Sequence, residues 1–199
     1  MPAKLQEPNV VKHFVTFALA TLLLTSCTAN SPANTGTASG TNYVAGDGSM
    51  TYVSTVNRGP AINLKGITLE RKPLDIRTWR GNVVVVNFWA SWCGPCRSEA
   101  ATLANSYKEF APRNVHFLGL NTRDGVAAAQ AFNSRFPTGF PSLQDQDGKL
   151  ILNFGNLGPA ATPTTIVLDS AGRIAARILG PVSQAQLRSV INAVIKDDQ

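Results

Sequence analysis

Apolar residues after position 80 occur either in unbroken runs or in stripes with helical spacing. The runs at 83–88 (VVVVNF) and 115–121 (VHFLGLN) are typical of strands that are buried on both faces of a sheet. Between these runs, apolar side chains recur at helical spacing over 100–110, which predicts an amphipathic helix that ends near Pro112 and Asn114. This part of the chain is therefore predicted to form a strand, a helix and a second strand.

The rest of the chain continues the same alternation. The further elements are predicted in this order: a helix at 126–136 after Asp124 and Gly125, a short strand at 140–143, a helical turn at 149–154 that ends at Gly155, a hairpin of strands 165–169 and 173–179, and a last helix that Ser183 caps. Strands that alternate with helices predict an α/β fold, in which a mixed central sheet carries helices on both faces.

The pattern before residue 80 is less regular. Residues 43–45 and 50–53 flank a Gly-rich turn at 46–49, and this arrangement predicts a β-hairpin. A second hairpin is expected around Gly66. We therefore expect the folded domain to begin with an N-terminal hairpin extension ahead of the main sheet.

The first residues have the features of an export signal. Lys4 and Lys12 precede an apolar run at 14–24, which is too short to span a bilayer but suits a signal peptide. The run ends in Leu-Thr-Ser-Cys, which resembles the lipobox of bacterial lipoproteins and implies lipidation of Cys27. An ordinary signal peptide is the alternative. The expected segments are a lipoprotein signal peptide at 1–26, the lipidated cysteine and a flexible linker at 27–42, and a folded domain at 43–199.

Composition excludes several classes of protein. Of the 199 residues, 44% are hydrophobic, which excludes disorder over the whole chain. The net charge of +6 comes from 18 basic and 12 acidic residues. Because the basic residues are scattered singly and no basic stripe interleaves with aromatic residues, we expect no nucleic-acid partner. Three cysteines can form one intramolecular disulfide at most.

Cys93 and Cys96 form a CxxC motif at the predicted junction between a buried strand and a helix. The unpaired N–H groups at a helix N-terminus stabilise an anion, so they favour the thiolate of Cys93, and the thiolate is the nucleophile in disulfide exchange. Cys96 lies one turn further, where it can attack a mixed disulfide at Cys93. A zinc site, a structural disulfide and two ordinary buried cysteines are the alternatives. The redox interpretation requires that solvent reach Cys93 and that its thiol ionise more readily than a free one.

The segment 88–96 (FWASWCGPC) resembles the active site of thioredoxins. Over about 43–196, the chain is similar to the extracytoplasmic thioredoxin-like branch that includes TlpA, ResA and the cytochrome c maturation thioredoxins. It shares their leader, their N-terminal hairpin and an insertion of a helix and a strand at about 124–143. The resemblance implies a thioredoxin fold with these additions. It also implies that Cys93 and Cys96 form the redox-active disulfide.

The resemblance assigns roles to further residues. It implies a cis peptide bond between Thr162 and Pro163, where the backbone would bind an extended substrate beside the disulfide. It implies that Glu99, three residues after Cys96, relays a proton to and from the resolving thiol. A solvated Glu99 in the first turn of the helix is the alternative. Asn87 departs from cytoplasmic thioredoxins, which carry a buried aspartate there, and this increases the need for another acid.

Two tryptophans flank the motif. We expect Trp92 to line the surface on which substrate lies, and we expect Trp89 to pack in the core.

The leading hypothesis is an extracytoplasmic, lipid-anchored thiol–disulfide oxidoreductase without a cofactor. By resemblance, it would reduce disulfides of exported proteins, apocytochrome c among them, and a transmembrane thiol-electron donor would reduce it again. An oxidant that installs disulfides is the second hypothesis. A thiol peroxidase lacks support because the chain has no lone peroxidatic cysteine motif. A copper carrier of the Sco type would need cysteines four residues apart, which this motif does not provide.

Overall fold

The computed structural model describes residues 46–199. The predicted signal peptide, Cys27, the linker and the first strand of the N-terminal hairpin lie outside these residues. Within the described part of the chain, no helix is long and apolar enough to cross a membrane.

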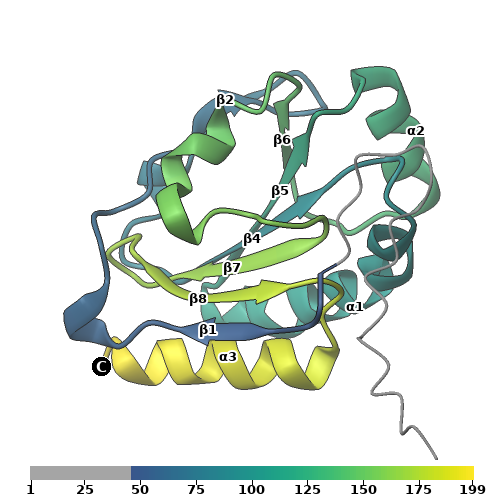
Figure 1. The fold of residues 1–199 in the computed structure, drawn as a ribbon. Helices are drawn as coiled ribbons and strands as arrows, with labels where there is room; N and C mark the ends of the chain where they lie inside the picture. The colour runs from purple at the N-terminus through teal and green to yellow at the C-terminus, as the bar shows by residue number, and fades with distance from the viewer. Residues whose placement is uncertain (1–45) are drawn as a thin grey trace, which may run out of the picture. The chain divides into compact units, whose positions relative to one another are not determined.

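A six-stranded mixed sheet forms the centre of the domain, in the order β1-β8-β7-β4-β5-β6 (Figure 1). The strands are β1 (Met50–Tyr52), β4 (Val84–Trp89), β5 (His116–Thr122), β6 (Ser142–Asp145), β7 (Thr164–Leu168) and β8 (Ile174–Leu179). β4 pairs in parallel with β5 and antiparallel with β7, and all six of its residues are buried. The prediction of a central strand in a mixed sheet is therefore confirmed.

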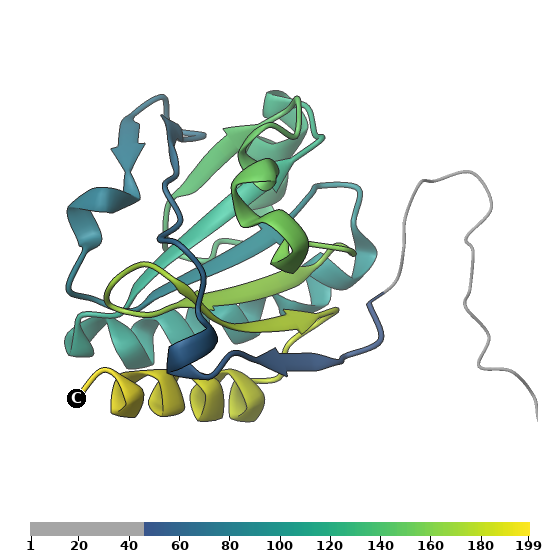
Figure 2. The ribbon, with the colours of Figure 1, turned by 60° about the vertical axis from the view of Figure 1, so that its left-hand side comes forward.

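Three α-helices follow the predicted pattern: α1 (Gly94–Phe110), α2 (Val126–Arg135) and α3 (Gln184–Asp197). α1 and α3 lie side by side on one face of the sheet, as Figures 1 and 2 both show, and their apolar stripes share one core with Val83, Val85 and Phe117. The Ser183 hydroxyl caps α3 by accepting a hydrogen bond from the backbone N–H of Gln186 at 3.2 Å. These contacts explain why the helical stripes could be recognised in the sequence.

The opposite face of the sheet is covered by 3₁₀ helices and by the segment that precedes β4. Of the 3₁₀ helices in the described chain, η2 (Ile76–Trp79) and η4 (Leu150–Leu157) pack on this face, whereas η1 (Thr55–Asn57) follows β1 and η3 (Ala111–Arg113) continues directly from α1. Ile76 of η2 and Phe154 of η4 share a core with Val84, Val86 and Phe88, which point away from α1. Helices thus cover both faces, as predicted, although one face carries 3₁₀ helices.

The predicted strand at Met50 pairs with β8 at the edge of the main sheet. One local boundary needs correction. The short strand of the insertion begins at Ser142 rather than at 140. The helical turn predicted at 149–154 does end at Gly155, whose φ of 52° and ψ of −136° are not helical, and the rest of η4 follows after this kink. The second hairpin is confirmed: β2 (Lys65–Ile67) pairs with β3 (Pro73–Asp75).

Candidate active site

The CxxC motif follows the carboxyl end of β4 and opens α1. Cys93 is the N-cap of this helix, and Pro95 lies in the first turn, where a missing N–H costs no helical hydrogen bond. The two sulfurs form a disulfide, and the Cys93 Sγ accepts a hydrogen bond from the backbone N–H of Cys96 at 3.1 Å. The helix N-terminus is therefore directed at the Cys93 sulfur, which favours its thiolate once the disulfide is reduced.

The disulfide is buried in this oxidised state. Cys93 has an exposed fraction of 0% and Cys96 of 3%, and both pack in a small apolar cluster with Leu69, Trp89 and Ala129. The expectation that solvent reaches Cys93 is therefore wrong for the disulfide form, because residues from the segment before β4 and from α2 pack around the two sulfurs. Exchange at this disulfide requires that this packing open locally.

Glu99 is buried one turn after Cys96, with an exposed fraction of 2%. One carboxylate oxygen, Oε1, accepts a hydrogen bond from Asn87 Nδ2 at 2.9 Å, and Oε2 accepts one from the backbone N–H of Val182 at 3.0 Å. Burial raises the pKa of Glu99 to about 7, although the hydrogen bonds from Val182 and Asn87 favour the charged form. The alternative of a solvated Glu99 is therefore wrong.

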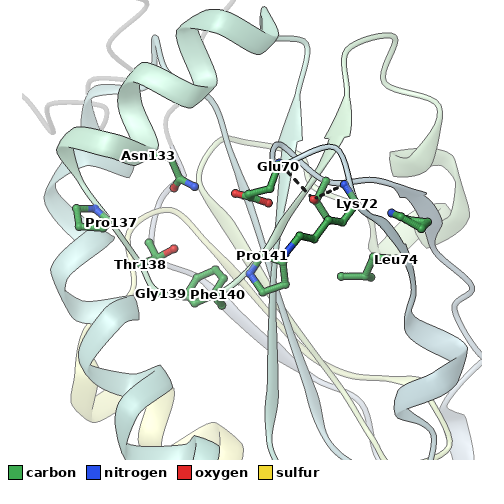
Figure 3. A pocket seen from close by; sticks show the side chains of 11 residues that line it. Glu70, Lys72, Leu74, Asn133, Pro137, Thr138, Gly139, Phe140 and Pro141 are labelled. Atoms are coloured by element: carbon green, nitrogen blue, oxygen red, sulfur yellow. Dashed lines mark hydrogen bonds between the residues drawn. The ribbon is translucent and has the colours of Figure 1, made fainter.

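Cys96 and Asn87 line the same small cavity. It measures about 10 Å³, close to the minimum that one water molecule needs, and Thr138 and Asn133 form part of its wall. Thr138 and Asn133 also border a larger groove of about 500 Å³ at the surface. Figure 3 shows this groove between the β2–β3 hairpin, with Glu70 and Lys72, and the loop from α2 to β6. The small cavity beside Cys96 and the surface groove therefore share part of their walls.

The peptide bond between Thr162 and Pro163 is cis, as predicted. In the antiparallel pairing of β4 with β7, Phe88 lies opposite Thr164. Pro163 therefore comes directly before the end of β7 that lies beside the loop leading to Cys93. Its carbonyl oxygen accepts a hydrogen bond from the backbone N–H of Gly180 at 2.8 Å.

The two tryptophans occupy the expected surroundings. Trp92 has an exposed fraction of 44%, and its Nε1 donates a hydrogen bond to the backbone oxygen of Arg123 at 3.3 Å. Trp89 is buried, packs against Phe132 of α2 and donates a hydrogen bond from Nε1 to the Ser142 hydroxyl at 3.2 Å. Trp92 therefore belongs to the surface beside the disulfide, and Trp89 belongs to the core beneath it.

Asp124 is a site residue that the sequence analysis took only for the start of a helix. Its carboxylate accepts hydrogen bonds from the backbone N–H of Ser91 at 2.6 Å, from the Ser91 hydroxyl at 2.8 Å and from Asn121 Nδ2 at 2.9 Å. The loop that leads to Cys93 is thereby fixed to the end of β5. The signal in the sequence was the position of Asp124 shortly after β5. The carboxyl ends of the parallel strands β4 and β5 meet at the same edge of the sheet, so residues that follow them lie close together.

Among residues 46–199, no group of three or more His, Cys, Asp or Glu side chains could hold a metal ion. His116, which lies in β5, stacks on Trp79 with a ring distance of 4.7 Å.

Comparison with known proteins agrees with this geometry. The Redoxin family model matches residues 55–195, which is well over half of the chain. The chain belongs to the Redoxin family. This redoxin is 32% identical over 137 residues to the thiol:disulfide interchange protein HelX of Rhodobacter capsulatus, a match that covers 68% of the chain and 74% of HelX. It is 26% identical to the thiol-disulfide oxidoreductase ResA of Bacillus subtilis, over 62% of the chain and 67% of ResA.

A solved structure of a related thiol-disulfide isomerase has the same fold. The secreted thiol-disulfide isomerase of Corynebacterium glutamicum superposes on the redoxin with a TM-score of 0.69 at 28% identity, over 77% of the chain and 95% of the isomerase. The expected thioredoxin fold and the resemblance to the TlpA and ResA branch are therefore confirmed. The redoxin is a thioredoxin-like thiol–disulfide oxidoreductase.

Proposed function

We propose that this redoxin reduces disulfide bonds of exported proteins, with apocytochrome c as a candidate client, through a dithiol–disulfide exchange at Cys93 and Cys96. The observation that carries the proposal is the position of Cys93 at the N-cap of α1, where its sulfur accepts the N–H of Cys96 beside the cis bond at Pro163. A helix N-terminus favours the thiolate, and a second cysteine one turn away can release the product.

The exchange has two steps that balance. The reduced Cys93 thiolate attacks one sulfur of the client disulfide, forms a mixed disulfide and displaces the other client sulfur as a thiolate. Cys96 then attacks the Cys93 sulfur, which restores the Cys93–Cys96 disulfide and releases the second client thiolate. The client gains two electrons and, on protonation of its thiolates, becomes a dithiol. A thiol donor then returns two electrons to the redoxin.

Glu99 takes the proton that Cys96 must lose before it attacks. With a pKa of about 7, the Glu99 carboxyl can accept a proton and release it again near neutral pH. The cavity shared by Cys96 and Asn87, whose amide binds Glu99, offers room for a water molecule between the thiol and this hydrogen-bonded pair. These contacts support a role for Glu99 as general base toward the resolving thiol.

The client would bind beside the disulfide as an extended segment. The backbone of Thr162, which Pro163 holds beside the disulfide through the cis bond, would offer it hydrogen bonds in the manner of an added strand, and the exposed ring of Trp92 would provide apolar contact. A contact of this kind recognises the backbone of the client rather than its side chains, so the same surface can bind more than one client.

The cellular setting follows from the leader and from the relatives. We propose that the redoxin is exported and is attached to the cell membrane through a lipid on Cys27, with residues up to 42 as linker. The secreted relative from Corynebacterium glutamicum supports the export. A membrane position also brings the site close to a transmembrane thiol donor that can reduce it again.

Trapping tests the assignment of the two cysteines. Cys96→Ser should accumulate a mixed disulfide between Cys93 and the client, whereas Cys93→Ser should not. Because iodoacetamide alkylates thiolates and not disulfides, it should be applied to the reduced protein, where Cys93 should react faster than Cys96. An unreactive Cys93, or client capture by Cys93→Ser, would contradict the proposed mechanism.

The direction of electron flow has its own test. The Gly-Pro dipeptide between the cysteines predicts a reduction potential near that of thioredoxin, about −270 mV, rather than near that of the oxidant DsbA, about −120 mV. Equilibration with mixtures of reduced and oxidised glutathione measures this value. A potential well above about −180 mV would favour the alternative function, in which the redoxin installs disulfides.

A further inference from the structure

The first described residues run beside the loop that connects β8 to α3. We call residues 46–49 the entry segment and residues 180–182 the β8–α3 loop. The backbone N–H of Gly48 donates to the carbonyl oxygen of Leu179 at 2.8 Å, and the N–H of Leu179 donates to the carbonyl oxygen of Ser49 at 2.9 Å. The entry segment is thus hydrogen-bonded to the last residue of β8, directly before the loop, and it extends the ladder between β1 and β8.

Gly46 packs directly against Gly180 in this loop. A Cβ atom at Gly46 would lie 2.1 Å from the backbone nitrogen of Gly180 and 2.5 Å from its Cα, so no other residue fits without displacement of backbone atoms. Gly180 has a φ of +91°, which also favours glycine, and a Cβ there would lie 2.9 Å from the Gly46 carbonyl oxygen. The two glycines therefore allow two stretches of backbone to touch.

The same loop contacts two parts of the active site. The N–H of Gly180 donates to the carbonyl oxygen of Pro163 at 2.8 Å. Two residues later, the N–H of Val182 donates to Glu99 Oε2 at 3.0 Å. A displacement of the loop would therefore disturb the cis-proline backbone and the buried carboxylate together.

We propose that the entry segment is a positioning element of the active site, in which Gly46 holds the β8–α3 loop at the place where its N–H groups bind both Pro163 and Glu99. This inference rests on the proposed function for the roles of Pro163 and Glu99. The backbone atoms nearest to a Cβ at Gly46 belong to Gly180 and Leu179, so Gly46 acts through Gly180. Residues 46–49 are thereby coupled to the chemistry of the disulfide.

The direction of the effect follows from the hydrogen bonds. The bond from Val182 stabilises the charged form of Glu99, so its loss would raise the pKa of that carboxyl further. The proton transfer that depends on Glu99 would then require a higher pH. Movement of Gly180 away from Pro163 would also weaken the binding of an extended client.

Gly46→Ala in the full chain tests this, with Gly59→Ala as the matched control. A Cβ at Gly59 meets nothing within 4 Å, and Gly59 does not have a positive φ. The assay follows the oxidation of the reduced protein by a peptide disulfide across pH, together with thermal melting by circular dichroism. We expect Gly46→Ala to move the pH midpoint upward by about half a unit or more and to raise KM several-fold, while Gly59→Ala changes neither. An unchanged midpoint in Gly46→Ala, with or without a lower melting temperature, would overturn the inference, as would an equal shift in the control.

Hydrogen exchange on the unaltered oxidised protein gives a second measurement, which does not depend on the folding of a variant or on catalysis. If the entry segment holds the loop, the amides of Gly48, Leu179, Gly180 and Val182 should exchange through one shared opening with a common opening free energy. If Gly180 and Val182 remain protected while Gly48 and Leu179 exchange freely, the inference is wrong. A redoxin that reduces no peptide disulfide at all would contradict the proposed function, yet this exchange pattern would still decide the role of Gly46.

Discussion

Replacement of Glu99 by glutamine should remove a pH dependence from the stability of the oxidised protein. Burial raises the pKa of Glu99 in the folded state to about 7, whereas an exposed glutamate in the unfolded chain titrates near 4.5. Between these values the folded protein binds the proton more tightly than the unfolded chain does. Tighter binding of this proton stabilises the folded protein at low pH. This contribution to the free energy of unfolding is lost as the pH rises through about 7.

The size of the effect follows from the two pKa values. For one group that titrates near 4.5 in the unfolded chain and near 7 in the folded protein, linkage predicts a loss of roughly 2–3 kcal/mol of unfolding free energy between pH 5 and pH 8. The glutamine of the variant carries no charge and should not show this loss. Its amide satisfies the N–H groups of Asn87 and Val182 less well, which costs about 1–3 kcal/mol, but this cost is the same at both pH values.

Urea unfolding of the oxidised wild type and of Glu99→Gln at pH 5 and pH 8 measures the difference. The wild type should lose more stability between the two pH values than the variant does, by roughly 2–3 kcal/mol. Burial lowers the pKa of His116, which makes stability rise with pH in this range, but His116 is present in both proteins and its contribution cancels. An equal loss in both proteins would refute the assignment of a raised pKa to Glu99.

The remaining predictions concern the two tryptophans and the loop before the disulfide. Trp89→Ala should lower the free energy of unfolding by about 3–5 kcal/mol because it empties a buried site, whereas Trp92→Ala should lower it by about 1 kcal/mol and instead raise KM for a protein disulfide. Urea unfolding and steady-state kinetics separate the two effects, and equal losses of stability would contradict the assigned positions. Asp124→Ala leaves three hydrogen-bond donors without their acceptor and should cost about 3 kcal/mol, whereas Ser91→Ala removes one of these bonds and should cost about 1 kcal/mol. A Ser91→Ala loss as large as that of Asp124→Ala in the same unfolding assay would show that Asp124 does not organise the loop.

The central part of this fold could be predicted from the sequence because the patterns that specify it are local. The β-branched run of β4 is buried on both faces, and the stripe of α3 faces one core, so periodicity alone identified both elements. The cysteine pair was found from a local motif of nine residues. The cis bond at Pro163 was implied by the resemblance to the thioredoxin-like branch, and not by the neighbours of the proline in the chain.

The features that the sequence did not predict depend on contacts between distant segments. Asp124 binds Ser91 across 33 positions, and Val182 binds Glu99 across 83. The burial of Cys93 results from residues before β4 and in α2 that pack around it, which no local pattern indicates. The pairing of β1 with β8 was likewise not predicted, because edge pairing is decided by the assembled sheet.

The contacts of Asn87 and Glu99 explain how, under the proposed mechanism, one acid can exchange a proton with Cys96. Thioredoxins of the cytoplasmic type are expected to carry a carboxylate in the strand, at the position of Asn87. Here the strand supplies an amide that donates to Glu99 at 2.9 Å, and the acid comes from α1. Two hydrogen bonds favour its charged form and burial opposes it, and this balance sets the pKa at about 7. Since one of those two bonds comes from the β8–α3 loop, any residue that moves this loop should also move the pKa of Glu99 and, under the proposed mechanism, the pH at which Cys96 loses its proton.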